Sequence, residues 1–248
     1  MGKRNTFSRR QFIGRAAGAV AGLTIVPRFV LGGPKFVAPS ETVHIALIGC
    51  GGQGRTNARG LMGQKDAKIV AVADPRDQAD YSQWYYKGQA GRLPVKGEIE
   101  KHYGRQDPGF KCTDYVDFRK LLDKEKNIDA VLCATPDHVH AYVTISAMRR
   151  GKHVYCEKPL THNIYEARMV AKEAAKAGVA TQMGNQGRSD EGNRITCEFV
   201  WDGAIGQVRE VHAWSSAGGW AGGRGRPKGT PEIPGGFNWD LWLGPKPF

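Results

Sequence analysis

The feature that most constrains the fold is a glycine-rich turn that directly follows an apolar run. Residues 43–48 are mostly apolar, and they end at a G-x-G-x-x-G pattern formed by Gly49, Gly51 and Gly54. In a dinucleotide-binding fold the first glycine makes a tight turn, the second admits a pyrophosphate, and the third allows a helix to pack closely on the strand. A second apolar run, residues 68–73, ends at Asp74, about 20 residues after the last glycine, where an acidic residue binds ribose hydroxyls.

The same turn predicts further cofactor contacts. Gly52 and Gln53 open the helix whose free N–H groups and dipole favour phosphate. Asp74 favours NAD, because a carboxylate repels a 2′-phosphate. Arg76 lies two residues further on, where it stacks on adenine, receives that phosphate or lies in solvent, so NADP stays possible. The alternative to a cofactor site is a glycine-rich surface turn.

The rest of the chain alternates between two hydrophobic periods. Apolar runs at 128–134, 152–156 and 179–183 predict strands, whereas 114–123, 138–150 and 163–177 have helical spacing. This alternation predicts an α/β fold, a Rossmann-type doubly wound parallel sheet. Residues 75–110 are polar and interrupted by Gly and Pro, which predicts an irregular insertion. Its aromatic residues predict a helix face packed on the domain or, as the alternative, a substrate patch: Tyr81, Trp84, Tyr85 and Tyr86.

Three predicted strand ends carry the remaining motifs. They are Ala134-Thr135-Pro136-Asp137-His138-Val139-His140, Cys156-Glu157-Lys158-Pro159-Leu160 and Met183-Gly184-Asn185-Gln186. Together with the glycine turn, they resemble the Gfo/Idh/MocA family of sugar and polyol oxidoreductases over about residues 43–214. The Glu-Lys-Pro triplet is the most specific part of this resemblance.

The resemblance implies hydride transfer between a tightly bound NAD(P) and a sugar or polyol hydroxyl. It implies that Lys158 is the acid/base, that Glu157 lies near the nicotinamide ribose, and that Thr135 and Pro136 lie along the cofactor. His138 and Asn185 are expected to line the same cleft. An NAD-dependent glycosidase of the same superfamily and a non-catalytic, cofactor-containing binding protein are the alternatives.

Lys158 suits this chemistry on its own properties. As hydride leaves the carbon of an alcohol, a nearby group must take the hydroxyl proton. A lysine beside the positively charged nicotinamide ring gives up its own proton more readily, and so becomes a usable base. Pro159 disfavours helical backbone at Lys158. The alternative is a surface lysine at a strand end, and for His140 a packed helix histidine is favoured over a catalytic one.

The N-terminus resembles an export signal. Arg9 and Arg10 precede Gln-Phe-Ile, and a largely apolar run follows at 13–26. This pattern resembles a Tat signal, and the run is too short to span a bilayer. We therefore expect residues 1–40 to be a leader, the protein to be periplasmic or otherwise exported, and the membrane to be met only through this leader. An ordinary amphipathic first helix is the alternative.

Charge and cysteine content exclude other functions. The first 40 residues hold seven basic and no acidic residues, which leaves +5 of the net charge of +12 for the rest of the chain. No basic stripe interleaved with aromatic residues stands out, so nucleic-acid binding is not expected. The five cysteines include no C-x-x-C pair, which predicts buried core residues without a disulfide or metal.

The last part of the chain predicts the beginning of another domain. Residues 41–185 make the predicted NAD(P)-binding domain, and 186–248 begin a substrate and oligomerisation domain, with a helix at 191–201 and a strand at 207–214. About 60 residues do not complete a sheet of four to six strands. We therefore expect a truncated chain that keeps its cofactor contacts, is inactive alone, and forms a homo-oligomer when full length.

Overall fold

A computed structural model of the chain describes residues 37–83, 86–214 and 229–246. The chain divides after Thr42 into two units. In the first, a short 3-10 helix, η2, spans Pro39–Glu41, and the second contains the sheet and the helices around it. The twin-arginine pattern, the apolar run after it, Trp84 and Tyr85 lie outside the described residues. No helix in the described part of the chain combines the length and apolar character needed to cross a membrane.

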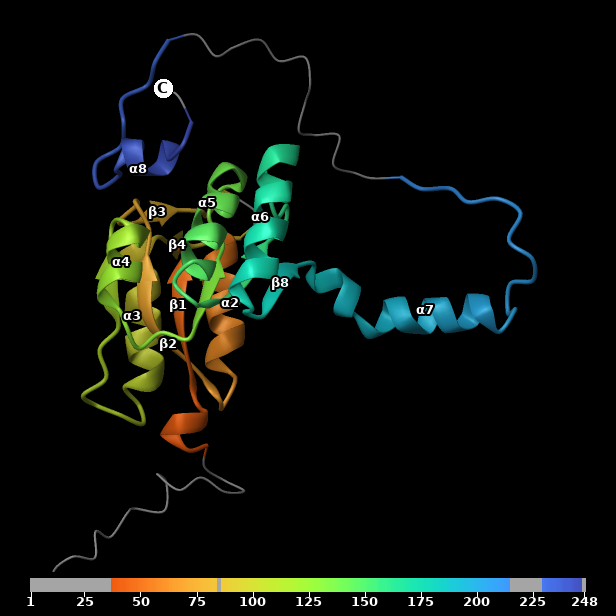
Figure 1. Cartoon of the computed structure of the whole chain (residues 1–248), viewed down its shortest axis with the longest axis horizontal. Helices are drawn as coiled ribbons and strands as arrows, with labels where there is room; N and C mark the ends of the chain where they lie inside the picture. Colours follow the sequence, from red (N-terminus) through yellow and green to blue (C-terminus); the bar gives the residue numbers. More distant parts are fainter. Residues whose placement is uncertain (1–36, 84–85, 215–228, 247–248) are drawn as a thin grey trace, which may run out of the picture. The chain divides into compact units, whose positions relative to one another are not determined.

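The second unit is built on a parallel six-stranded sheet with the order β5-β2-β1-β6-β7-β8 (Figure 1). The strands are β1 (Val43–Ile48), β2 (Ala67–Ala73), β5 (Thr113–Tyr115), β6 (Ala130–Cys133), β7 (His153–Glu157) and β8 (Thr181–Gly184). From β1 the chain proceeds outward to β2 and β5, and then crosses back to β6 on the other side of β1. The predicted Rossmann-type sheet is confirmed, and its strand order reverses between β1 and β6.

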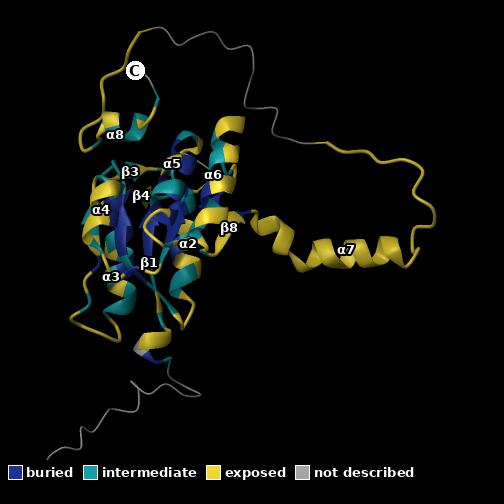
Figure 2. Ribbon diagram, in the orientation of Figure 1, coloured by how far each residue is buried: buried dark blue, intermediate teal, exposed yellow. Residues whose placement is uncertain are grey.

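Helices cover both faces of this sheet. On one face α2 (Gly52–Met62) and α3 (Arg92–Tyr103) contribute buried residues to one core cluster. On the other, α4 (Phe118–Lys124), α5 (Asp137–Met148) and α6 (Ile164–Ala177) contribute to a second cluster. Figure 2 shows the buried strands between these partly exposed helices. Burial on both faces explains why the inner strands β1, β2 and β6 read as nearly continuous apolar runs.

Local sequence sets the limits of α6 as predicted. The side chain of Asn163 accepts a hydrogen bond from the N–H of Glu166 at 2.9 Å, and the side chain of Glu166 accepts one from the N–H of His162 at 2.8 Å. These contacts satisfy N–H groups that the first turn of a helix leaves free. Gly178 ends the helix at φ +64°, a left-handed conformation that glycine adopts without steric cost.

The prediction that residues 75–110 are irregular is wrong. They contain the helix α3 and a short hairpin of β3 (Ala79–Asp80) and β4 (Gln89–Ala90). Pro94 and Gly97 obscured the helix in the sequence, yet Pro94 lies in the first turn, where proline is tolerated. Val95 and Ile99 are one helical turn apart and fully buried. Tyr81 and Tyr86 lie in the β3–β4 connection and not on the helix face that we predicted.

The C-terminal predictions are confirmed only in part. The helix α7 (Glu191–Trp201) forms as predicted, but residues 207–214 form no strand. These residues are exposed, and a β-rich sequence needs a neighbouring strand to form a ladder. Cys197 is exposed on α7, so the prediction of burial holds for the other four cysteines only. A last short helix, α8, spans Trp239–Leu243.

Candidate functional site

A cleft of about 1050 Å³ lies at the carboxyl ends of β1, β2 and β6. This is the edge of a doubly wound sheet, beside its switch point, where such folds bind ligands. Six of the residues predicted from the sequence line the cleft: Gly49, Gly51, Asp74, Arg76, Thr135 and Pro136. The structure therefore brings together groups from three separate strand ends.

The three glycines of the turn have different reasons to lack a side chain. A Cβ on Gly49, whose φ is +95°, would lie 2.5 Å from the carbonyl of Ala134, and one on Gly54 would overlap the carbonyl oxygen of Gly49. The fold itself excludes both. A Cβ on Gly51 would meet only the hydroxyl of Tyr81, at 3.3 Å. The space in front of Gly51 is thus open to the cleft, as the approach of a pyrophosphate requires.

Asp74 is fixed by the backbone at the end of β2. One carboxylate oxygen accepts a hydrogen bond from the N–H of Cys50 at 2.6 Å, and the other accepts one from the N–H of Arg76 at 2.7 Å. Burial raises the pKa of Asp74 to about 6, against the opposing effect of these two hydrogen bonds. A carboxylate that is held at the rim of the cleft is a suitable acceptor for two adjacent ribose hydroxyls.

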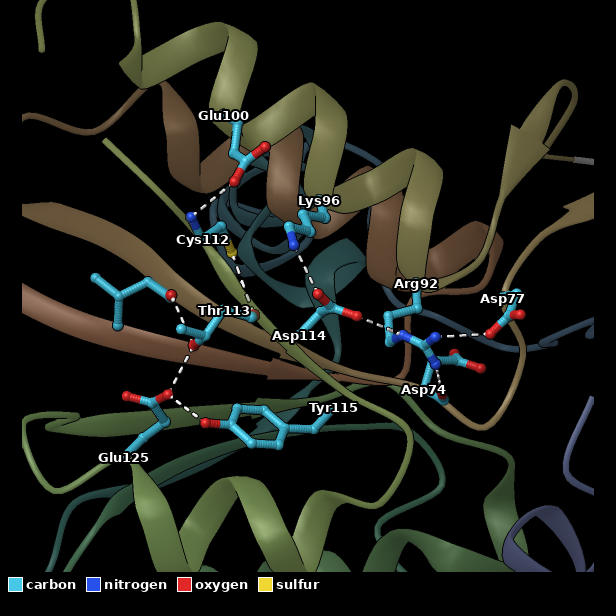
Figure 3. A network of polar contacts seen from close by, with 11 residues as sticks. Asp74, Asp77, Arg92, Lys96, Glu100, Cys112, Thr113, Asp114, Tyr115 and Glu125 are labelled. Atoms are coloured by element: carbon cyan, nitrogen blue, oxygen red, sulfur yellow. Dashed lines mark hydrogen bonds and ion pairs between the residues drawn. The ribbon is translucent and has the colours of Figure 1, made fainter. Parts of the chain in front are cut away.

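A buried guanidinium supports the loop that carries Asp74 (Figure 3). Arg92, at the start of α3, is 8% exposed. It donates to Asp114 at 2.8 Å, to Asp77 at 2.7 Å and to the backbone oxygen of Asp74 at 3.4 Å. Lys96 also donates to Asp114 at 2.6 Å, and this bond and that from Arg92 hold the pKa of Asp114 below its ordinary value.

Glu157 is a buried carboxylate at the end of β7, held by amide side chains. Its Oε1 accepts hydrogen bonds from Asn57 at 2.7 Å, from Gln186 at 2.5 Å and from Gln53 at 3.3 Å. Gln53 also accepts one from the hydroxyl of Tyr86 at 3.1 Å. The predicted residues Gln53 and Glu157 therefore form one network, which links the first turn of α2 to β7.

The other predicted residues lie around these two groups. Lys158 and Asn185 are exposed and follow the adjacent strands β7 and β8, outside the lining of the cleft. The Lys158–Pro159 peptide bond is cis. His138 contacts the carbonyl oxygen of Trp242 at 2.8 Å, and its ring packs edge-on against that indole. Gly52 is buried under the ring of Tyr86 and does not line the cleft.

Sequence reasoning missed an aromatic wall of the cleft. Residues 234–245 include Phe237, Leu241 and Trp242, which line it opposite the strand ends. The guanidinium of Arg76 lies 5.1 Å from the centre of the Phe237 ring. The N–H of Asp77 donates to the backbone oxygen of Gly236 at 2.8 Å. The signal was present in the Trp-x-x-Trp spacing of Trp239 and Trp242, whose rings stack at 4.9 Å.

The part of the chain that contains the sheet matches one protein family. A family described as "Oxidoreductase family, NAD-binding Rossmann fold" matches residues 43–185. This match begins at β1 and ends just after β8, so it covers the whole sheet, whereas the aromatic wall at 234–245 lies outside it.

Individual relatives match about two thirds or more of this chain. The chain is 31% identical over 166 residues to a scyllo-inositol 2-dehydrogenase (NAD(+)) of Bacillus subtilis, covering 66% of this chain and 42% of that protein. It is 28% identical over 180 residues to a 2,7-anhydro-N-acetylneuraminate hydratase of Mediterraneibacter gnavus, covering 73% and 41%. The structure of a myo-inositol 2-dehydrogenase from Lactobacillus plantarum superposes with a TM-score of 0.52 at 27% identity, covering 67% and 43%.

These matches cover only part of each relative. The chain spans less than half the length of the relatives it matches. The shared part includes the dinucleotide-binding domain, and the family match covers more than half of this chain. The chain belongs to the Gfo/Idh/MocA family of oxidoreductases, with an NAD-binding Rossmann fold.

Proposed function

We propose that this protein is an NAD-dependent oxidoreductase that transfers hydride between its nicotinamide cofactor and a hydroxyl group of a sugar or polyol. The observation that carries the proposal is the pairing of an open glycine, Gly51, with a backbone-fixed carboxylate, Asp74, on the rim of one cleft. Relatives named as inositol dehydrogenases support the substrate class.

The sheet order gives the direction of the cofactor. Asp74 follows β2, the glycine turn follows β1, and the motifs of Thr135 and Glu157 follow β6 and β7 on the opposite side. A dinucleotide with its adenosine ribose at Asp74 and its pyrophosphate at Gly51 extends toward β6 and β7. The aromatic wall at Phe237 and the guanidinium of Arg76 then flank the adenosine half.

NAD suits the residues of this rim better than NADP. A phosphate on the adenosine ribose would lie against the carboxylate of Asp74, and the two like charges repel. Arg76 is already engaged, because its Nε donates to the backbone oxygen of Gln78 at 2.7 Å and its guanidinium lies over Phe237. We therefore propose NAD as the cofactor.

Lys158 is the residue we assign to proton transfer. It follows Glu157, which three amide side chains fix beside α2. When bound, the nicotinamide supplies the acceptor for the hydride. Lys158 is exposed, so its side chain can extend to a substrate hydroxyl beyond the strand ends. We propose that its neutral amine takes the hydroxyl proton during oxidation, and that the ammonium so formed returns a proton during reduction.

The test is a comparison of binding and turnover in the full-length protein. Lys158→Met should bind NAD+ as the wild type does, because no cofactor-holding contact is removed, and should reduce turnover by about 100-fold or more. Turnover is followed as NADH formation with myo-inositol, scyllo-inositol and a panel of hexoses. Lys120→Met, which removes an exposed lysine on α4, is the matched control. Unchanged turnover in Lys158→Met would remove Lys158 from the mechanism.

One finding favours a second candidate function. A relative at 28% identity is named as a hydratase, and hydration produces no net oxidation or reduction. In such a reaction the bound NAD would be reduced and then reoxidised within each turnover. The same holds for the NAD-dependent glycosidases, which the sequence leaves as an alternative. NADH that accumulates with substrate supports the dehydrogenase, whereas product formation without NADH supports the redox-neutral alternative.

We also propose that the protein is exported. The support is the Arg9-Arg10 pair with its apolar run, which lies outside the described residues. Replacing both arginines with lysine should keep a reporter fused to the N-terminus inside the cell, while the native pair carries it out. Equal export of both fusions would contradict this proposal.

A further inference from the structure

His140 is a buried side chain that takes no part in the cofactor contacts proposed for the cleft. It lies on α5 and is 1% exposed. Its Nδ1 is 2.6 Å from the carbonyl oxygen of Pro159, and its Nε2 is 2.7 Å from the carbonyl oxygen of Thr135. One imidazole ring thus joins the loop after β6 to the loop after β7. These two loops carry the motifs on the side of the cleft away from Asp74.

The two contacts define the charge of the ring. A carbonyl oxygen only accepts hydrogen bonds, so each contact requires an N–H on the imidazole. A neutral imidazole has one N–H, and only the imidazolium ion has two. Burial by itself lowers the pKa of His140, but contacts with Cys156, Pro159 and Thr135 outweigh burial and raise it to about 9. The two carbonyl contacts indicate an imidazolium at neutral pH, and the raised pKa agrees with them.

Two thiols face this ring from the sheet. Cys133 on β6 and Cys156 on β7 are paired in register, and their sulfur atoms lie with a ring nitrogen of His140 within 4.8 Å of one another. The hydrogen bond with Cys133, and burial, raise the pKa of Cys156, which keeps it a neutral thiol. Such a trio resembles a metal site, but an imidazolium has no lone pair to give to a metal.

We propose that His140 is a positioning residue, an imidazolium that ties the loop of Thr135 to the loop of Lys158 and thereby shapes the nicotinamide half of the cleft. This inference rests on the proposed function. The adenosine half has its own support, since the hydrogen bonds of the Asp74 and Arg92 side chains go to residues outside these two loops. Loss of the tie should therefore weaken binding at one end of the cofactor only.

The experiment compares two ligands that differ at that end. NAD+ and ADP share the adenosine and the pyrophosphate, and only NAD+ carries the second ribose and the nicotinamide. His140→Gln has one donor nitrogen in place of the two ring nitrogens, and it cannot contact both carbonyls. We expect calorimetric titration to show that NAD+ binds about tenfold more weakly, which corresponds to the loss of one charged hydrogen bond, and that ADP binds as to the wild type.

A control and a second measurement keep the test decisive. Ile99→Val on α3 loosens the core away from both loops, and it should leave the ratio of the two affinities at the wild-type value. Nitrogen-15 NMR of the wild type should show both ring nitrogens of His140 protonated at pH 7, which does not depend on any variant folding. A single protonated nitrogen, or equal losses for both ligands in His140→Gln, would overturn the inference. If the wild type binds neither ligand, the proposed function fails while the NMR result still decides the state of His140.

Discussion

The glycine turn yields a prediction that separates folding from binding. Gly51→Ala places a methyl group in front of the turn, where only the hydroxyl of Tyr81 lies near, at 3.3 Å. The backbone at Gly51, with φ −71° and ψ −165°, suits alanine. Replacing an N-cap glycine with alanine destabilises a helix by less than about 1 kcal/mol. The same change lowers the conformational entropy of the unfolded chain, which stabilises the fold by about 0.4–1 kcal/mol. The free energy of unfolding should therefore stay within about 0.5 kcal/mol of wild type.

The same substitution should damage cofactor binding. The methyl group occupies the space through which a pyrophosphate approaches the backbone, and overpacking of this kind costs about 1–3 kcal/mol. That corresponds to a loss of NAD+ affinity of about 10- to 100-fold. Gly54→Ala is the comparison variant that should damage folding, because its Cβ would overlap the carbonyl oxygen of Gly49. It should destabilise the fold by about 3 kcal/mol or more.

Two measurements on purified variants check this pair. Urea unfolding followed by circular dichroism gives the free energy of unfolding, and calorimetry gives the NAD+ affinity. Wild-type affinity in Gly51→Ala would refute the assignment of the open space to the pyrophosphate. Wild-type stability in Gly54→Ala would refute the packing role of the third glycine.

Two further predictions concern charge. Because the pKa of Asp74 is raised to about 6, its acceptor form becomes fully available only above that pH. NAD+ affinity measured by calorimetry should rise as the pH increases through about 6, and Asp74→Asn should bind NAD+ weakly without this pH dependence. The free energy of unfolding should fall as the pH rises from about 4 through 6, because the carboxyl of the unfolded chain loses its proton at a lower pH than that of the folded chain. Arg92→Met leaves two carboxylates without their shared cation and should lower the free energy of unfolding by about 2–3 kcal/mol. Arg150→Met, which breaks an exposed pair with Asp123, should change it by less than about 1 kcal/mol, and equal effects in thermal or urea unfolding would contradict the role of Arg92.

The sequence predicted those parts of the fold whose signals are local. The strand before Gly49, the helix after it and the position of Asp74 depend on a short stretch of chain, and all three form as predicted. The capped helix at Asn163 is another local signal. The helix α3 escaped detection because Pro94 and a glycine interrupt its apolar period, although neither residue prevents the helix from forming.

The supporting parts of the site could not be predicted in this way. Arg92 and Asp114 meet across α3 and β5, and His140 reaches carbonyl groups on two separate loops. Such contacts depend on how the elements pack, and no spacing in the sequence encodes them. The strand predicted at 207–214 does not form, although its residues favour β structure, because they pair with no strand among the described residues.

The central claim is that this cleft holds NAD with its adenosine ribose at Asp74. The most direct measurement is calorimetric titration of the purified chain with NAD+ and, separately, with NADP+. We expect one NAD+ bound per chain and markedly weaker NADP+ binding, because the carboxylate of Asp74 meets the extra phosphate. Absence of NAD+ binding, or a preference for NADP+, would contradict the claim.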